Sequence, residues 1–219
     1  MFFTKYKAFN VYFLFVILAY FLAINFLPAY EKVTKPLIMA SLLGFYISGN
    51  TRQNNAFLLG MIFALLGDVF LLFEGDLFFK IGLFSFLLMQ ISYASVFIRY
   101  KGSVHKNFWL LLALLIVFSS FLLFLLWPGL GINRLAVSIY ILAILIMVIN
   151  GLRMNIHSPV YNVVNFGTLS FLLSDTILAV NKFYVPVIAS GYLIMIPYIV
   201  AQYCIVTGMK ELHSQSIHR

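Results

Sequence analysis

The sequence predicts an all-α integral membrane protein, a bundle of about eight transmembrane helices forming a single polytopic domain over residues 1–219. Three observations predict this class. Hydrophobic residues make up 63% of the chain and charged residues only 9%, which is more apolar surface than a soluble exterior can carry. Apolar stretches about long enough to cross a bilayer recur along the whole chain. The polar breaks between them are short and leave no room for a soluble domain.

The apolar stretches predict the helices in order. The first begins with basic residues, as a signal peptide does, but its apolar run is long and no small-x-small cleavage site closes it before Pro28. We therefore expect it to be kept as a helix. The second stretch is short. The predicted spans are residues 10–27, 36–49, 55–73, 79–98, 108–126, 132–150, 160–180 and 184–208.

The distribution of Lys and Arg predicts the orientation. With the N-terminus inside the cell, nine of the 14 basic residues fall inside and five outside, so both termini are expected inside. The net charge of +8 is scattered over the segment ends. This pattern indicates membrane topology and contact with lipid head groups, and it argues against nucleic-acid binding. We expect a multi-pass protein of a bacterial inner (cell) membrane.

Two carboxylates interrupt the predicted spans. Asp68 lies in LLGDVFLLF and Asp175 lies in FLLSDTILAV. A charged Asp at the centre of a membrane helix costs roughly 2.5–3.5 kcal/mol, so each needs a compensating role. The predicted topology places both at similar depth. Because LLGDVFLLF and LLSDTILAV align without a gap, the chain is expected to contain a parallel four-plus-four repeat that brings the two aspartates together.

Two interpretations of Asp68 and Asp175 are open. Each could be a structural residue that pairs with Ser, Tyr or Asn of a neighbouring helix. Alternatively, one protonated and one ionised carboxyl could work as an acid–base pair on a glycoside or an acetal-like bond. No Lys or Arg lies deep in an apolar run, so a basic partner is not obvious. We predict that both are catalytic.

Other polar side chains within the spans are expected to line a cavity. Taken singly, each could form a hydrogen bond between helices; taken together they predict a substrate-binding site made of Gln90, Tyr93, Tyr140, Asn165, Tyr198 and Gln202. No metal or other cofactor is predicted, because the histidines lie in the breaks or the C-terminal tail and not in the core. These are His105, His157, His213 and His218.

The sequence resembles the YhhN-type lysoplasmalogenase family of eight-helix membrane proteins over nearly the whole chain. The strongest parts are LLGDVFLL and FGTLSFLLSDTILAVNKF, with their G-D and S-D pairs. VTKPLIMASLL, SIYILAILIM and IPYIVAQYCIV support it. The sequence departs from the family at Gln90, where the resemblance implies a histidine. Gln can form hydrogen bonds but cannot titrate.

The resemblance implies an enzyme that hydrolyses the vinyl ether bond of a lysoplasmalogen to a fatty aldehyde and a glycerophospho-ethanolamine or -choline. One neutral aspartate would protonate the alkene carbon, and one anionic aspartate would stabilise the cation and activate water. Either aspartate could take either role. The substrate is then a lysophospholipid drawn from membrane lipid, and Lys35 and Lys182 could contact its phosphate.

Two alternatives use the same residues. A proton-coupled transporter would employ the aspartates as relay groups. A non-catalytic lipid-binding membrane protein would hold lipid without chemistry, and the glutamine at position 90 keeps this alternative open. Release of free aldehyde from lysoplasmalogen separates these alternatives from the hydrolase.

Overall fold

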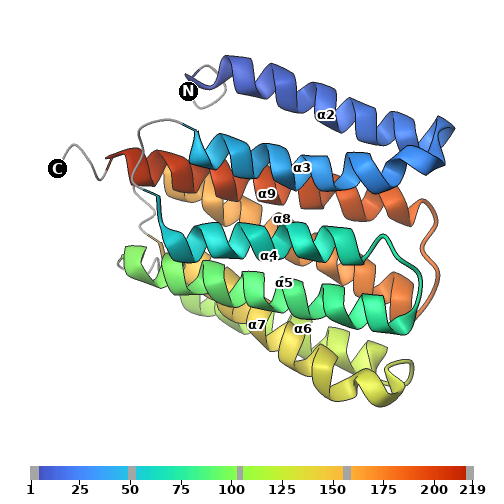
Figure 1. Ribbon diagram of the computed structural model, residues 1–219. Coiled ribbons are helices and arrows are strands. Elements are labelled where there is room, and N and C mark those ends of the chain that lie inside the picture. Colours follow the sequence, from blue (N-terminus) through green and yellow to red (C-terminus); the bar gives the residue numbers. More distant parts are fainter. Residues whose placement is uncertain (1–4, 49–52, 103–105, 155–158, 216–219) are drawn as a thin grey trace. The chain divides into compact units, whose positions relative to one another are not determined.

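The computed structural model describes residues 5–48, 53–102, 106–154 and 159–215. Within these ranges the chain forms eight α-helices joined by short turns, and its only strand-like feature is an isolated bridge between Lys101 and Met154. The all-α prediction is confirmed. The helices (Figure 1) are α2 (Lys7–Phe26), α3 (Glu31–Ile47), α4 (Asn55–Phe70), α5 (Asp76–Phe97), α6 (Phe108–Leu126), α7 (Arg134–Leu152), α8 (Pro159–Phe183) and α9 (Ser190–Gln215).

Each predicted span overlaps one of these helices. Six of them, α2 and α5 to α9, are long and apolar enough to cross a membrane. α4 is apolar but has 16 residues, and α3 has 17 residues and begins with charged side chains. The chain is therefore a multi-pass integral membrane protein. Its orientation stays a prediction.

The last helix begins later than the sequence predicts. The expected span was 184–208, but the helix runs over Ser190–Gln215. The residues before it form a turn, in which the Asn181 side chain accepts a hydrogen bond from the Val187 backbone N–H at 2.8 Å. Ala189 ends this turn with a positive φ of 55°. The prediction missed the turn because its residues are nearly as apolar as the helix that follows.

The helices fall into two compact units. Unit 1 comprises residues 1–89 and 210–219, and unit 2 comprises residues 90–209. In unit 1, α3 packs against both α2 and α4. The core of this unit consists of side chains that are fully buried, including Met39, Leu42, Phe57 and Met61.

Unit 2 is built on α6, α7 and α8, which pack against one another in pairs, and on α9. Small residues let α8 and α9 approach closely. A Cβ atom at Gly167 would lie 2.9 Å from the Ala201 carbonyl oxygen, and one at Gly208 would lie 2.5 Å from Cγ2 of Val164. This packing fixes α8, the helix that carries Asp175.

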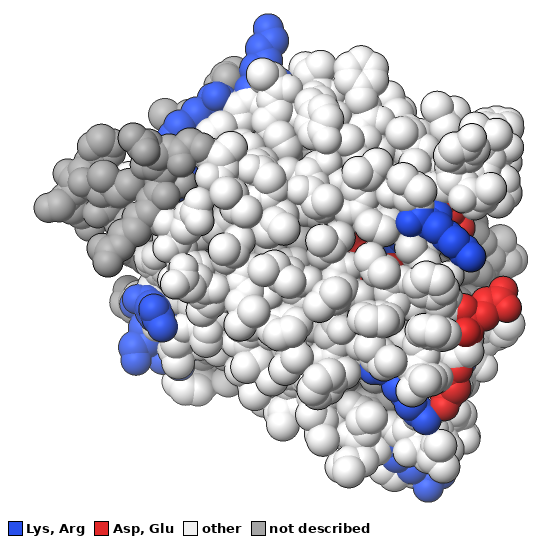
Figure 2. All heavy atoms as spheres, in the orientation of Figure 1, with Lys and Arg blue, Asp and Glu red and all other residues white. Residues whose placement is uncertain are grey.

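The surface of the helices is largely apolar. Phe15 on α2 and Phe124 on α6 are 66% and 77% exposed, which would be unfavourable in water but suits contact with lipid chains. Figure 2 shows a face of the molecule on which most atoms belong to uncharged residues.

Candidate functional site

Asp175 is the centre of a hydrogen-bonded cluster in unit 2. The Tyr140 hydroxyl donates to Oδ2 of Asp175 at 2.5 Å, and the Gln90 amide donates to the same oxygen at 3.4 Å. The three side chains come from α8, α7 and α5. The structure therefore brings together three residues that the sequence predicts for the site.

Local packing holds each member of this cluster. Gln90 is fully buried and Tyr140 nearly so. Beside Asp175, the Ser174 hydroxyl donates to the Ile194 carbonyl oxygen at 2.8 Å and ties α8 to α9. This bond helps to fix the backbone that carries the Asp175 carboxyl group.

The two oxygens of the Asp175 carboxyl differ. Both donors bind Oδ2, so a proton carried by Asp175 belongs on Oδ1. Asp175 is only partly buried, unlike Gln90. Oε1 of Gln90 is buried and has no hydrogen-bond partner among the described residues. Gln90 therefore uses its N–H₂ group toward Asp175 and leaves an acceptor unpaired.

Three further predicted residues lie in the core of unit 2. The Tyr93 hydroxyl donates to Oε1 of Gln202 at 3.2 Å, and this bond joins α5 to α9. Tyr198 is buried, with its ring 6.1 Å from the ring of Phe171. The Tyr93–Gln202 bond is of the interhelical kind that the sequence left open as an alternative. The substrate-binding role of these three residues stays a prediction.

Asp68 and Lys35 belong to unit 1. Asp68 lies near the end of α4 and is 2% exposed. The preceding Gly67 lies against the ring of Phe86, where a Cβ atom would be 2.7 Å from Cε2. Lys35 is partly buried on α3. The catalytic role of Asp68 and the phosphate-binding role of Lys35 stay predictions.

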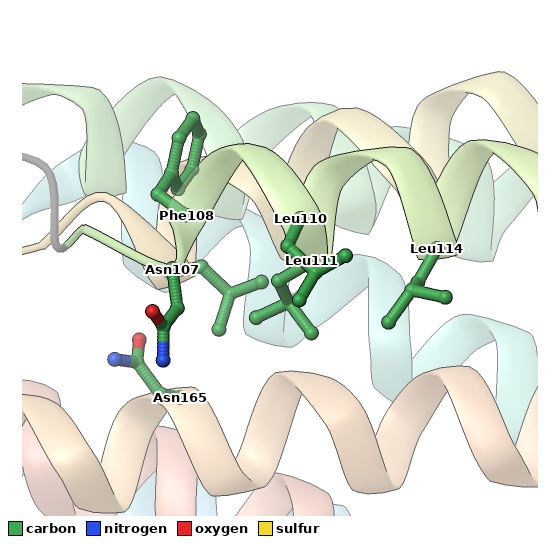
Figure 3. Close-up of a pocket in the computed structure, with 7 residues that line it drawn as sticks. Asn107, Phe108, Leu110, Leu111, Leu114 and Asn165 are labelled. Atoms are coloured by element: carbon green, nitrogen blue, oxygen red, sulfur yellow. The ribbon is translucent and has the colours of Figure 1, made fainter.

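Asn165 lies in a different place from the Asp175 cluster. It lines a pocket of about 290 Å³ between α6, α7 and α8, together with Asn107, Phe108 and leucines of α6 and α7. Figure 3 shows the Asn107 and Asn165 side chains pointing toward one another at one end of this pocket. Asn165 precedes Asp175 by ten residues on α8, which is about 15 Å at roughly 1.5 Å per residue.

The sequence-based placement of His213 outside the core was wrong. Because α9 continues to Gln215, His213 lies within the helix and is 4% exposed. Its Nδ1 atom is 2.8 Å from the Tyr46 hydroxyl. The other three histidines lie outside the described residues. The missed signal is the helical spacing of Ile205, Met209 and Leu212, which are all buried.

Lys210 lies on α9 one helical turn before His213. Its burial was not predicted from the sequence. Its Nζ atom donates to the backbone carbonyl oxygens of Phe45 and Ser48, and lies 3.5 Å from that of Tyr46. These carbonyls end α3, so Lys210 caps the C-terminus of that helix. Among the described residues, no three His, Cys, Asp or Glu side chains gather as a metal site would require.

The sequence model of the YhhN family matches residues 30–209. No solved structure matches the chain. The matched range contains Asp68 and all three members of the Asp175 cluster, and it covers well over half of the 219 residues. The chain therefore belongs to the YhhN family.

Proposed function

We propose that this protein is a membrane hydrolase that cleaves the vinyl ether bond of a lysoplasmalogen, with Asp68 and Asp175 as its catalytic carboxyls. Membership of the YhhN family supports a lysoplasmalogenase-type activity at the level of the family. The observation that carries the proposal is the Asp175 carboxyl, held at one oxygen by Tyr140 and Gln90 within apolar helices.

The proposed reaction begins with a proton. A carboxylic acid delivers it to the alkene carbon that is not bonded to oxygen, and an oxocarbenium ion forms at the neighbouring carbon. A carboxylate stabilises this cation and removes a proton from the attacking water. The resulting hemiacetal breaks its bond to the glycerol oxygen. One water is consumed, and the products are a fatty aldehyde and the glycerophospho head group.

The arrangement around Asp175 suits both halves of this chemistry. As an anion, it has two hydrogen-bond donors on Oδ2 that stabilise the charge. As a neutral acid, it carries its proton on Oδ1, to which neither donor binds. Both roles therefore remain available to Asp175, and Asp68 is proposed to take the complementary one.

The remaining site residues are assigned supporting roles. Gln90 orients Asp175 but cannot deliver a proton, so the proton transfers are assigned to the two aspartates. Lys35 is proposed to contact the phosphate of the substrate. Tyr93, Tyr198 and Gln202 are proposed to shape the substrate cavity from within unit 2.

The experiment compares two lysophospholipids that differ in one bond. Purified protein is incubated with 1-alkenyl lysophosphatidylethanolamine and with its saturated 1-alkyl analogue, and free aldehyde is measured. We expect aldehyde only from the alkenyl lipid, because the alkyl ether offers no carbon to protonate. Asp68→Asn and Asp175→Asn should each lower the rate by about 100- to 10,000-fold, the range of general acid–base catalysis.

Asp76→Asn is the matched control, since Asp76 is an exposed carboxyl paired with Lys80. It should retain the wild-type rate. Folded Asp68→Asn and Asp175→Asn variants that still release aldehyde at the wild-type rate would refute the proposed catalytic roles. Lipid that binds but yields no aldehyde would indicate the non-catalytic binder, and proton-coupled uptake into vesicles would indicate the transporter.

A further inference from the structure

The pocket between α6, α7 and α8 has an apolar length and a polar end. Leu110, Leu111 and Leu114 of α6 form its apolar part. Leu110 and Leu114 are 64% and 56% exposed, so the pocket opens on the lipid-facing surface of unit 2. Its volume of about 290 Å³ is at the small end of the range for ligand sites. The apolar, lipid-facing part of the pocket suits an acyl chain of a membrane lipid.

The polar end of the pocket holds an unpaired acceptor. Oδ1 of Asn165 is buried and has no hydrogen-bond partner in the described part of the chain. The side chain that faces it belongs to Asn107 (Figure 3), an exposed residue at the start of α6. A buried polar atom of this kind calls for an explanation, and a ligand that brings an O–H or N–H group supplies one.

Basic residues lie near the same end of the pocket in structure or in sequence. The Arg153 guanidinium lies over the Phe108 ring, with Cζ 6.0 Å from the ring centroid, and Phe108 lines the pocket. The Gly102 backbone N–H donates to the Arg153 carbonyl oxygen at 2.8 Å, and Gly102 directly follows Lys101 in the chain. Lys106 immediately precedes Asn107.

Acidic side chains do not balance this charge within the unit. Residues 90–209 contain six Lys and Arg but one acidic residue, Asp175, which lies about 15 Å farther along α8 than Asn165 at roughly 1.5 Å per residue. A phosphate group is the complement that a membrane supplies to a basic cluster next to an apolar groove.

We propose that this pocket binds a membrane phospholipid whose head group carries a hydrogen-bond donor, at a site separate from the Asp175 cluster. One acyl chain lies along the leucines of α6, the phosphate lies near Arg153, and a head-group O–H or N–H satisfies Asn165. The proposal is independent of hydrolysis. It gives Asn165 a role in lipid binding in place of the substrate contact that the sequence predicts.

The test is native mass spectrometry of the full-length protein, released from vesicles of dioleoyl phosphatidylethanolamine, phosphatidylglycerol or phosphatidylcholine. The first two lipids carry a head-group donor and the third does not. We expect the wild type to retain one molecule of ethanolamine or glycerol lipid about tenfold more often than choline lipid. Equal retention of all three would show only general contact with membrane lipid and would overturn the proposal.

Two variants locate the site. Leu114→Trp fills the groove and should abolish the retained lipid, whereas Leu135→Trp, on an exposed leucine of α7 outside the pocket, should not. Asn165→Leu should reduce ethanolamine and glycerol lipid to the level of choline lipid. Lipid retention that is unchanged in Leu114→Trp would contradict the proposal.

Photolabelling of the wild type covers the case in which a variant does not fold. Phosphatidylglycerol with a diazirine in its chain should label peptides containing residues 107–114 more strongly than those of α2, whose side chains also face lipid. Uniform labelling of the two regions would contradict the site.

Discussion

Two polar clusters, one in each unit of the described chain, differ in how completely their charges are paired. In unit 1, the Lys210 ammonium donates to carbonyl oxygens at the end of α3 and lies 4.4 Å from the ring centroid of Phe45. In unit 2, the Asp175 carboxyl receives both its donors on Oδ2, and the neighbouring Gln90 keeps an unpaired acceptor.

Under the proposed function, this difference separates a structural cluster from a reactive one. A buried charge whose hydrogen-bonding capacity is used by the backbone stabilises the fold and has little left for a ligand. A carboxyl group that accepts hydrogen bonds at one oxygen is oriented by them. Its other oxygen, to which neither donor binds, is left to exchange a proton. We therefore expect changes at Lys210 to affect stability and changes around Asp175 to affect turnover.

The largest effect on stability is expected for Lys210→Met. The change leaves buried carbonyls at the end of α3 without their donor, and each unsatisfied group costs about 1–3 kcal/mol. We expect a loss of about 2–4 kcal/mol in the free energy of unfolding, seen as a lower Tm in detergent. Lys80→Met, at an exposed pair with Asp76, should change it by less than about 1 kcal/mol. An unchanged Tm together with lost turnover would mean that Lys210 acts in function and not in stability.

Tyr140→Phe removes the shortest hydrogen bond to Asp175 and keeps the ring. A hydrogen bond to a charged group contributes about 1.5–3 kcal/mol, so we expect kcat for aldehyde release to fall about 10- to 100-fold. The Tm should stay near that of the wild type. Tyr30→Phe, on a largely exposed tyrosine, serves as the control. A wild-type kcat in Tyr140→Phe would show that this contact is structural.

A smaller effect is expected for Gln90→Leu. The Gln90 bond to Asp175 is long, at 3.4 Å, and the variant also removes a buried acceptor that has no partner in the described residues. We expect kcat to fall about three- to tenfold, equivalent to roughly 0.7–1.4 kcal/mol, without loss of Tm. A decrease as large as that of Asp175→Asn would mean that Gln90 takes part in the chemistry itself.

The smallest effect concerns Tyr6, which precedes α2 and lies outside the candidate membrane spans. Burial raises the pKa of Tyr6, and a hydrogen bond to the Glu211 carboxylate at 2.9 Å raises it further. Because the folded pKa exceeds the unfolded value of about 10, the folded state holds the proton more tightly. This stability is complete below about pH 10 and is lost as the pH rises through the folded pKa.

Thermal unfolding of the wild type and Tyr6→Phe, measured from pH 8 to pH 11, checks this prediction. The Tm of the wild type should fall more steeply above pH 10 than that of the variant. Parallel curves would show that the Tyr6–Glu211 contact contributes nothing to stability in this range.

The sequence predicts the helices well, and three of its candidate site residues come together around Asp175. Apolar runs locate every helix because a bilayer dictates their length, yet α9 was misplaced where Val185 and Val187 make a turn look helical. Asp175 and Tyr140 were predicted because polar groups in apolar helices are costly. Lys210 and His213 were missed because they follow the last apolar run. Asn165 was grouped with Asp175 by helical spacing, which gives a side chain's face but not its neighbours across helices; it lines the pocket between α6, α7 and α8.

The most direct test of the central claim is hydrolysis of 1-alkenyl lysophosphatidylethanolamine in D₂O. If an aspartate delivers a solvent-derived proton to the alkene carbon, the aldehyde released by the wild type carries one deuterium on the carbon next to its carbonyl. Unlabelled aldehyde incubated alongside corrects for exchange. Asp175→Asn should release almost none. Aldehyde without this deuterium, or its undiminished release by folded Asp175→Asn, would contradict the account.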